Sequence, residues 1–229
     1  LKCRSIKVKK SSLNKLYMAS NKSLKAKNYP ILIGFVIWLL FFIVTFLTIS
    51  SKKVFQFSNF FAEIENARLL NLIVFPFLII IINGILPSNI KAGLVFFRFK
   101  YVLPGHRVFT KLVHRDPRID TKKLFNQIGY KPVLPSEQNK LWYSIYKKIE
   151  STPFISESHR VFLLTRDIAA ISFLFIPIGI LILILNDLSL NIITKFSLVS
   201  SIQYVVIALV ASNYGKRFAL NVLAEYSSS

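Results

Sequence analysis

Residue types that carry out chemistry in enzymes are scarce in this sequence. The single cysteine, Cys3, excludes a disulfide within the chain and any zinc site built from several thiolates. Glycines are few and isolated, as at Gly93 and Gly105, which excludes a glycine-rich loop for nucleotide phosphates. No nucleophile stands with a matched base. We therefore predict no cofactor and expect that the protein is not an enzyme.

Acidic residues are scarce as well, whereas apolar and basic residues are abundant. The 229 residues include 30 Lys and Arg but only 10 Asp and Glu, which gives a formal net charge of +20. Hydrophobic residues make up 53% of the chain and the mean hydropathy is +0.52. Soluble enzymes rarely combine these values, so the composition indicates apolar membrane segments and a strongly basic remainder.

Four long apolar runs account for the high hydropathy. A helix needs about 20 mostly apolar residues to cross the hydrocarbon core, and roughly 17 to 25 are tolerated. The first run is longer than a signal-peptide core and no small-residue cleavage pattern follows it, so we expect it to be retained. The sequence therefore predicts an all-α integral membrane protein with four transmembrane helices in two hairpins. The runs cover residues 31–50, 69–86, 168–185 and 196–211.

The distribution of Lys and Arg predicts the orientation of these helices. Nine basic residues precede the first run and fifteen lie between Lys91 and Arg166, whereas the loops within the two hairpins hold three and one. Basic residues in short loops resist translocation. We therefore expect both termini and the middle segment to be cytoplasmic, in the inner membrane of a bacterium.

The runs divide the chain into two tails, two hairpins and one insert. Met18, the only methionine, is a candidate start of translation. The insert lies near the lower size limit for an independent core, so we expect it to pack on the membrane helices or on another copy. The segments are a basic N-terminal tail (1–29), the first hairpin (30–87), a basic helical module (88–166), the second hairpin (167–212) and a C-terminal tail (213–229).

Capping residues predict helices in the module. Asp120 is an expected N-cap for a helix that stops at Gly129, and Ser136 for a helix that runs through Glu150. Pro153 marks the start of a third helix, and no breaker separates it from the third apolar run. We therefore expect the third transmembrane helix to extend into the cytosol.

A few polar residues and prolines interrupt the apolar runs. Pro76 and Pro177 should kink their helices, because proline removes an intrahelical hydrogen bond. Asn71, Asn83 and Gln203 lie at or near membrane depth, and we expect them to form hydrogen bonds between helices. A passive channel or transporter lined by these three residues is an alternative. No charge lies at the centre of a run, which argues against a proton-coupled transporter.

The module carries two groups of charged residues that suggest roles. Between Lys91 and Arg166 the fifteen basic residues outnumber five acidic ones, a surplus that an acidic protein or a nucleic acid could bind. The residues assigned to partner binding are Arg115, Arg118, Lys122, Lys123, Lys147 and Lys148. The residues expected to form a structural charge cluster around a proline turn are Arg115, Asp116, Arg118 and Asp120.

A third pattern in the module concerns histidine. His114 follows Arg107 after six residues, which resembles the arginine-to-histidine spacing of HEPN-type ribonucleases. This resemblance implies that two copies meet and that both residues act at the scissile phosphate, although Val108 replaces the polar residue that commonly follows the arginine. His106 and His159 complete the set of histidines, but no pair has the i, i+4 spacing of metal ligands on a helix. We therefore predict no metal.

Taken together, these patterns favour a non-enzymatic membrane protein. We expect it to sit in the lipid bilayer, to form homo-oligomers and to couple a cytosolic protein, nucleic acid or other signal to the membrane. Membrane effectors and sensors of bacterial antiphage systems share this layout, which is an analogy of architecture only. A membrane-anchored ribonuclease that uses Arg107 and His114 and a passive channel are the alternatives.

The orientation can be tested by labelling with a membrane-impermeant thiol reagent. A cysteine introduced at Ser58 should be labelled in intact cells, whereas one at Ser136 should be protected, because the charge asymmetry places these positions on opposite sides. The unsubstituted chain, which contains Cys3, measures background labelling. Labelling of Ser136→Cys in unbroken cells would reverse the orientation.

Overall fold

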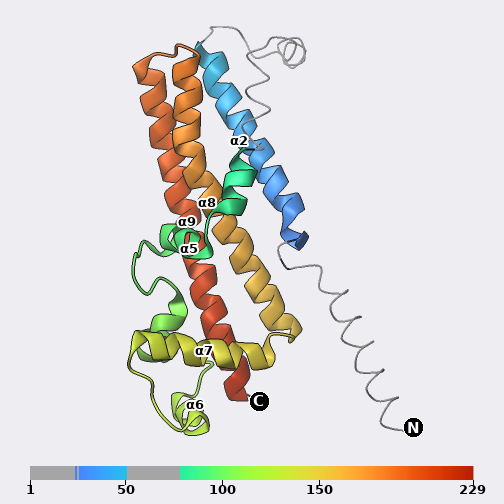
Figure 1. Cartoon of the computed structure of the whole chain (residues 1–229), viewed down its shortest axis with the longest axis vertical. Coiled ribbons are helices and arrows are strands. Elements are labelled where there is room, and N and C mark those ends of the chain that lie inside the picture. The colour runs from blue at the N-terminus through green and yellow to red at the C-terminus, as the bar shows by residue number, and fades with distance from the viewer. Residues whose placement is uncertain (1–23, 25, 51–77, 229) are drawn as a thin grey trace, which may run out of the picture.

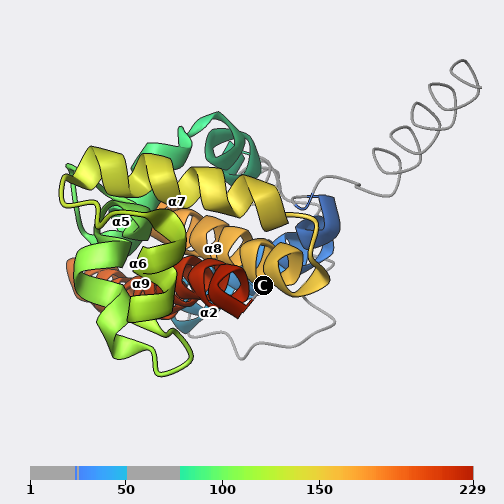
Figure 2. The same ribbon diagram turned by 90° about the horizontal axis from the view of Figure 1, so that it is seen from below.

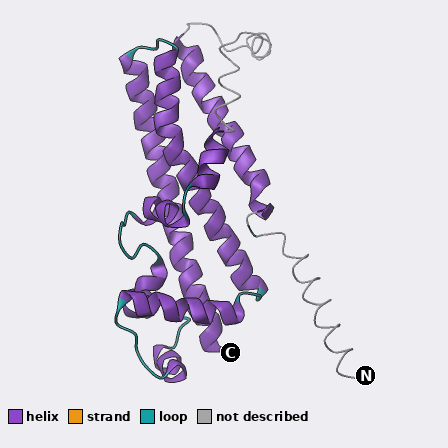
Figure 3. Cartoon of the chain, viewed as in Figure 1, coloured by secondary structure: helices purple, strands orange, loops and turns teal. Residues whose placement is uncertain are grey.

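The computed structural model describes residue 24, residues 26–50 and residues 78–228. Every regular element in this part of the chain is a helix (Figure 3). A helical segment, Leu78–Ile85, precedes α5. The other elements are η1 (Ala26–Asn28), α2 (Tyr29–Ser50), α5 (Ser88–Phe96), η2 (Pro104–Arg107), η3 (Val108–Leu112), η4 (Val113–Arg115), α6 (Thr121–Ile128), α7 (Pro135–Ile149), α8 (Pro153–Leu185) and α9 (Leu190–Ser228).

Two long antiparallel helices, α8 and α9, run through the whole molecule (Figure 1). They contain 33 and 39 residues, which corresponds to lengths of about 50 and 58 Å at about 1.5 Å per residue. A hydrocarbon core is only about 30 Å thick, so both helices must project well beyond it. The start of α8 and the end of α9 lie beside each other at the projecting end (Figure 1), which is called the module end below.

Among the described residues, three helices are long and apolar enough to cross a membrane, and a bent pair raises the number to four if it forms one span. The pair consists of Leu78–Ile85 and α5, which meet at an angle of 100°. Pro87 lies in the break and precedes the first residue of α5. Proline disfavours helical geometry in the residue before it and cannot donate a backbone hydrogen bond, which explains why the first helix of the pair ends here. The apolar run that ends at residue 86 did not predict this bend.

Small residues allow α8 and α9 to pack closely. The buried small residues Ser200, Ala208 and Gly215 lie about two turns apart along α9. Gly179 of α8 faces the ring of Phe196 so closely that a Cβ atom there would overlap the ring. Small residues let helix backbones approach in lipid, where apolar burial alone does not drive association. The sequence pattern did not reveal this seam, because its members are widely spaced among bulky residues.

The buried apolar residues form two cores along the same helix pair. One core joins α2 and the upper parts of α8 and α9, where Phe42, Phe175 and Phe196 contact one another with ring centroids 5.4–6.0 Å apart. The other core joins the helices of the module end around Trp142 and Phe218. Exposed Ile, Leu, Val and Phe side chains lie along α2, α8 and α9. Such an apolar exterior matches a surface that faces lipid.

The module end is built by α6 and α7, which pack beside the projecting parts of α8 and α9 (Figure 2). The indole Nε1 of Trp142 donates a hydrogen bond to the carbonyl oxygen of Ala219 over 3.0 Å, which ties α7 to α9. Asp120 caps α6 by accepting hydrogen bonds from the backbone N–H groups of Lys122 and Lys123, and Gly129 ends the helix with a φ of 83°. Both predicted ends of α6 are therefore confirmed.

The other predicted helices are found with shifted ends. Helix α7 begins with Pro135 after Leu134, so Ser136 lies inside its first turn and is not its N-cap. Helix α8 begins at Pro153 and continues without interruption through Pro177 to Leu185, which confirms one helix from the module into the third apolar run. Residues 213–228, assigned to a tail, are the last turns of α9. Residues 1–23 and 51–77, with Ser58, Asn71 and Pro76, lie outside the described residues.

The close approach of α8 and α9 can be tested with one added methyl group. A Cβ atom at Gly215 would lie 2.6 Å from Phe96 Cζ and 2.7 Å from Phe162 Cε2. We expect Gly215→Ala to lower the thermal stability of the purified protein in detergent, because overpacking a core costs about 1–3 kcal/mol. Gly34→Ala on α2 is the control, since no atom lies within 4 Å of its Cβ position. Equal melting temperatures for both variants would contradict close packing at Gly215.

Candidate functional site: a basic pocket at the module end

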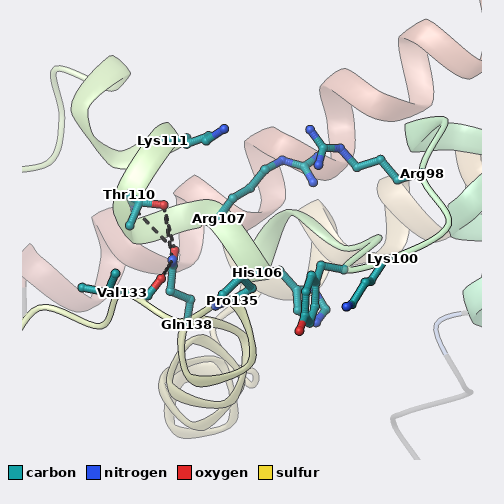
Figure 4. Close-up of a pocket in the computed structure, with 10 residues that line it drawn as sticks. Arg98, Lys100, His106, Arg107, Thr110, Lys111, Val133, Pro135 and Gln138 are labelled. Atoms are coloured by element: carbon teal, nitrogen blue, oxygen red, sulfur yellow. Dashed lines mark hydrogen bonds between the residues drawn. The ribbon is translucent and has the colours of Figure 1, made fainter.

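A cavity of about 290 Å³ opens between the segment that follows α5 and the start of α7. Four of its lining residues are Lys or Arg and none is acidic. Figure 4 shows the side chains that line the cavity, which come from residues 98–101, 106–111 and 133–138. The lining residues are Arg98, Lys100, Tyr101, His106, Arg107, Thr110, Lys111, Val133, Pro135 and Gln138.

An irregular helical stretch forms one wall of the cavity. The 3₁₀-helix η2 begins with Pro104, passes into the π-helix η3 and ends in the 3₁₀-helix η4. Changes of helix type leave backbone groups without their usual partners. The buried side chain of Gln138 supplies partners, since its Oε1 accepts hydrogen bonds from the N–H groups of Phe109 (3.2 Å) and Thr110 (3.3 Å). Its Nε2 donates to the Val133 carbonyl oxygen over 2.9 Å, so one side chain holds this wall against the loop before α7.

Two arginines face each other across the cavity. The guanidinium groups of Arg98 and Arg107 extend toward one another (Figure 4). Neither forms an ion pair with any residue that the structure describes. Burial, together with the charge of Arg98, lowers the pKa of Arg107 from its ordinary value. Two like charges at close range raise the energy of the site unless an anion lies between them.

The Arg107 guanidinium is also partly buried against the Phe96 ring of α5. Its Nη1 atom is buried and has no hydrogen-bond partner among the described residues. The guanidinium lies over the ring of Phe96, with 5.7 Å from Cζ to the ring centroid. A cation over an aromatic face is stabilised, but the unpaired N–H donors remain available. Arg107 is therefore a charged donor without an acceptor in this structure.

His106 lies at the edge of the same cavity. Its Nδ1 is 3.2 Å from the carbonyl oxygen of Leu103, and its ring packs against Tyr101 with centroids 5.3 Å apart. Burial is the main cause that lowers the pKa of His106. The imidazole is therefore neutral at pH 7 and can donate one hydrogen bond without adding charge to the cavity.

A buried charge cluster lies where α5 meets α8. Asp167 Oδ1 accepts hydrogen bonds from Lys91 Nζ over 3.3 Å and from Arg166 Nη2 over 2.9 Å. All three residues are less than 8% exposed. Buried charges persist when they are paired, and removal of one partner is strongly destabilising. This cluster could not be predicted from residue spacing, because Lys91 is 76 residues from Asp167.

Of Arg107 and His114, only Arg107 borders the cavity. Arg107 lines the cavity, whereas His114 is exposed in η4 and is not a lining residue. The sequence spacing singled out Arg107, but the residue that the fold places opposite it is Arg98.

The predicted charge cluster is divided between two roles. Asp116 forms a two-pronged ion pair with Arg118, at 3.0 and 2.7 Å, and this pair lowers the pKa of the carboxyl group. Asp120 is instead the cap of α6. Arg118 Nη2 also donates to Asn221 Oδ1 of α9 over 2.9 Å, so the turn is attached to the long helix pair. Arg115 is exposed and takes part in none of these bonds.

The remaining predicted partner-binding residues do not share one concavity. Lys122 and Lys123 are exposed on α6. Lys147 pairs with Glu150 at 2.7 Å, and the Lys148 ammonium lies 5.7 Å from the ring centroid of Tyr226. These lysines add positive charge to the module surface, but none of them lines the cavity.

Two of the predicted intramembrane polar residues are described. Asn83 is buried and its Oδ1 atom has no hydrogen-bond partner among the described residues, whereas Gln203 is half-buried on α9. Among the described residues, the predicted interhelical hydrogen bonds of Asn83 and Gln203 are not observed.

Helix content, hydropathy and the apolar exterior agree on one class of protein: an all-helical protein with three to four helices suited to a membrane. Comparisons with protein-family models, curated proteins and solved structures found no match.

The contribution of Gln138 can be tested by removing its hydrogen bonds. Gln138→Leu leaves two backbone N–H groups unpaired, at a cost of about 1–3 kcal/mol for each buried group. We expect a clear loss of thermal stability in detergent, and little change for Gln127→Leu, since Gln127 is exposed on α6. The same melting temperature for Gln138→Leu as for the unsubstituted protein would show that other groups hold the cavity wall.

Proposed function

We propose that this chain is a multi-pass membrane protein that binds a phosphate-bearing anion in the basic pocket and couples its binding to the α8–α9 pair. In this proposal the protein acts as a receptor or coupling subunit and not as an enzyme. The module end faces the cytosol, as the distribution of basic residues indicates. Bound anion is the signal, and a change in the packing or assembly of the membrane helices is the response.

The observation that carries the proposal is the pair Arg98 and Arg107, which face each other without an acid between them. Arginine presents planar donors that match the oxygen atoms of a phosphate group. Lys100 and Lys111 line the same space and supply further donors. A dianion between the two guanidinium groups would replace repulsion by two attractive contacts. This arrangement supports recognition of phosphate more than general attraction to a basic surface.

Contacts from Arg107 reach the long helix pair in two steps. Arg107 lies over Phe96 of α5, and the Phe96 ring is 6.1 Å from the ring of Phe162 on α8. Both rings border Gly215 of α9, where no space is left for a Cβ atom. A shift of Arg107 toward a bound anion therefore acts on a close contact that α9 makes with α5 and α8 at Gly215. This is the physical basis proposed for coupling.

The ribonuclease hypothesis gains no support from this geometry. A histidine that acts at the scissile phosphate must reach the group that the arginine holds, and His114 does not line the cavity of Arg107. The channel hypothesis rests on Asn83 and Gln203 alone among the described residues. Neither alternative is therefore carried forward.

Anion-dependent stabilisation tests the proposed function. A ligand that binds only the folded state at about 100 times its Kd stabilises by about 2.7 kcal/mol, which corresponds to roughly 5–11 °C for a chain of this size. We expect pyrophosphate to raise the melting temperature of the full chain in detergent, compared with chloride at equal ionic strength. Arg107→Gln should abolish this rise without lowering the melting temperature in chloride, because it removes a repulsive charge.

Arg115→Gln is the matched control for charge. It removes one exposed arginine of the module that does not line the pocket, so the response to pyrophosphate should persist. An equal loss of the response in Arg107→Gln and Arg115→Gln would mean that the anion binds the basic surface generally. No rise for the unsubstituted protein would refute phosphate binding in the pocket.

A further inference from the structure

The loop between α5 and η2 exposes three aromatic side chains next to the pocket. Phe97 and Tyr101 are 56% and 41% exposed, and Phe99 is fully exposed. Phe97 and Tyr101 also adopt positive φ angles of 50°, which are rare for bulky residues. Exposing these rings to water is unfavourable, since a buried Phe side chain is favoured by about 1.5–3 kcal/mol over an exposed one. The strained backbone adds to this cost. A surface with this composition requires an apolar neighbour.

Contacts of this loop place it at the level of the membrane helices. The ring of Phe97 packs edge-on against Tyr204, with centroids 6.3 Å apart, and Tyr204 lies within the fourth apolar run. The hydroxyl of Tyr204 donates to the carbonyl oxygen of Leu94 in α5 over 2.8 Å. Lys91 of α5 pairs with Asp167, which directly precedes the third apolar run. The loop therefore lies beside the fourth apolar run, and the helix that precedes it is attached at the start of the third.

Aromatic and basic residues alternate along the same loop. Phe97 and Phe99 flank Arg98 and do not line the pocket, whereas Arg98, Lys100 and Tyr101 do. Aromatic rings and basic side chains together are typical of the headgroup region of a bilayer. We propose that the pocket binds the phosphate head group of an anionic phospholipid, while the exposed rings of the loop contact its acyl chains. This inference rests on the proposed phosphate-binding function and names its ligand.

Charge and size favour an anionic head group over other phosphate compounds. The lining residues include no acid, so the ammonium group of a zwitterionic lipid would have no partner and would face four basic side chains. A cavity of about 290 Å³ is at the lower limit for drug-sized ligands, which span roughly 300–1,000 Å³. The cavity therefore suits a head group better than a complete nucleotide. Lipid also reaches the pocket by diffusion within the bilayer, at high local concentration.

The experiment compares phospholipids with soluble compounds that carry phosphate groups. The full chain in detergent micelles is titrated with short-chain phosphatidylglycerol, short-chain phosphatidylcholine, glycerol phosphate and ATP, and the concentration that gives half of the maximal thermal stabilisation is measured. We expect phosphatidylglycerol to act at a concentration at least tenfold lower than any of the other three compounds. Arg98→Gln should raise the midpoint for phosphatidylglycerol about tenfold or more, because charge-assisted hydrogen bonds are lost.

Phe99→Ser separates lipid contact from phosphate contact. Phe99 is fully exposed, so the substitution leaves folding intact. It should raise the midpoint for phosphatidylglycerol several-fold and leave that for glycerol phosphate unchanged. Tyr130→Ser removes another exposed aromatic residue, beyond α6, and should change neither midpoint.

The possible outcomes distinguish this inference from the proposed function. Equal midpoints for phosphatidylglycerol and glycerol phosphate, with no effect of Phe99→Ser, would leave a soluble-phosphate site and overturn the lipid inference alone. A lower midpoint for ATP would do the same in favour of a nucleotide. Equal action of phosphatidylcholine would overturn the preference for anionic lipid. No stabilisation by any of the four compounds would overturn both proposals.

Discussion

Close packing between α8 and α9 supports both halves of the molecule, because each helix belongs partly to the apolar half and partly to the module. Helices in lipid gain little from apolar burial, since the surrounding chains are equally apolar, and their contact depends on shape. Gly179 and Gly215 provide that shape at two points along the pair. The module then uses the projecting ends of the same helices as its wall, through contacts such as that of Trp142 with Ala219.

Basic side chains come together at two places in the structure, and only one of these places contains an acidic residue. Lys91 and Arg166 are buried but share the carboxylate of Asp167, which joins α5 to α8. Arg98 and Arg107, in and after the loop that follows α5, have no such acid. In the first arrangement both cations contact an internal carboxylate, and the cluster is structural. The second leaves two cations in need of an external anion, and this difference is what makes the pocket a candidate site.

Several features of the candidate site could be read from the sequence and others could not. The basic surplus of the module was evident, and Arg107 was singled out by its spacing from His114. The facing residue, Arg98, was not, because the changes of helix type between residues 104 and 115 have no recognisable sequence pattern. The predicted partner-binding residues follow the surplus of basic residues along the chain, but that surplus does not determine which side chains border a cavity.

The sequence by itself determined the helical class, the apolar runs and the caps of α6. These depend on hydrophobic length and on hydrogen bonds between residues close in the chain. Only the tertiary structure decided the bend at Pro87, the seam between α8 and α9, the buried cluster around Asp167 and the approach of Arg98 to Arg107. Each of these depends on how separate helices approach one another in space, and residue spacing along one helix contains no information about the partner it will meet.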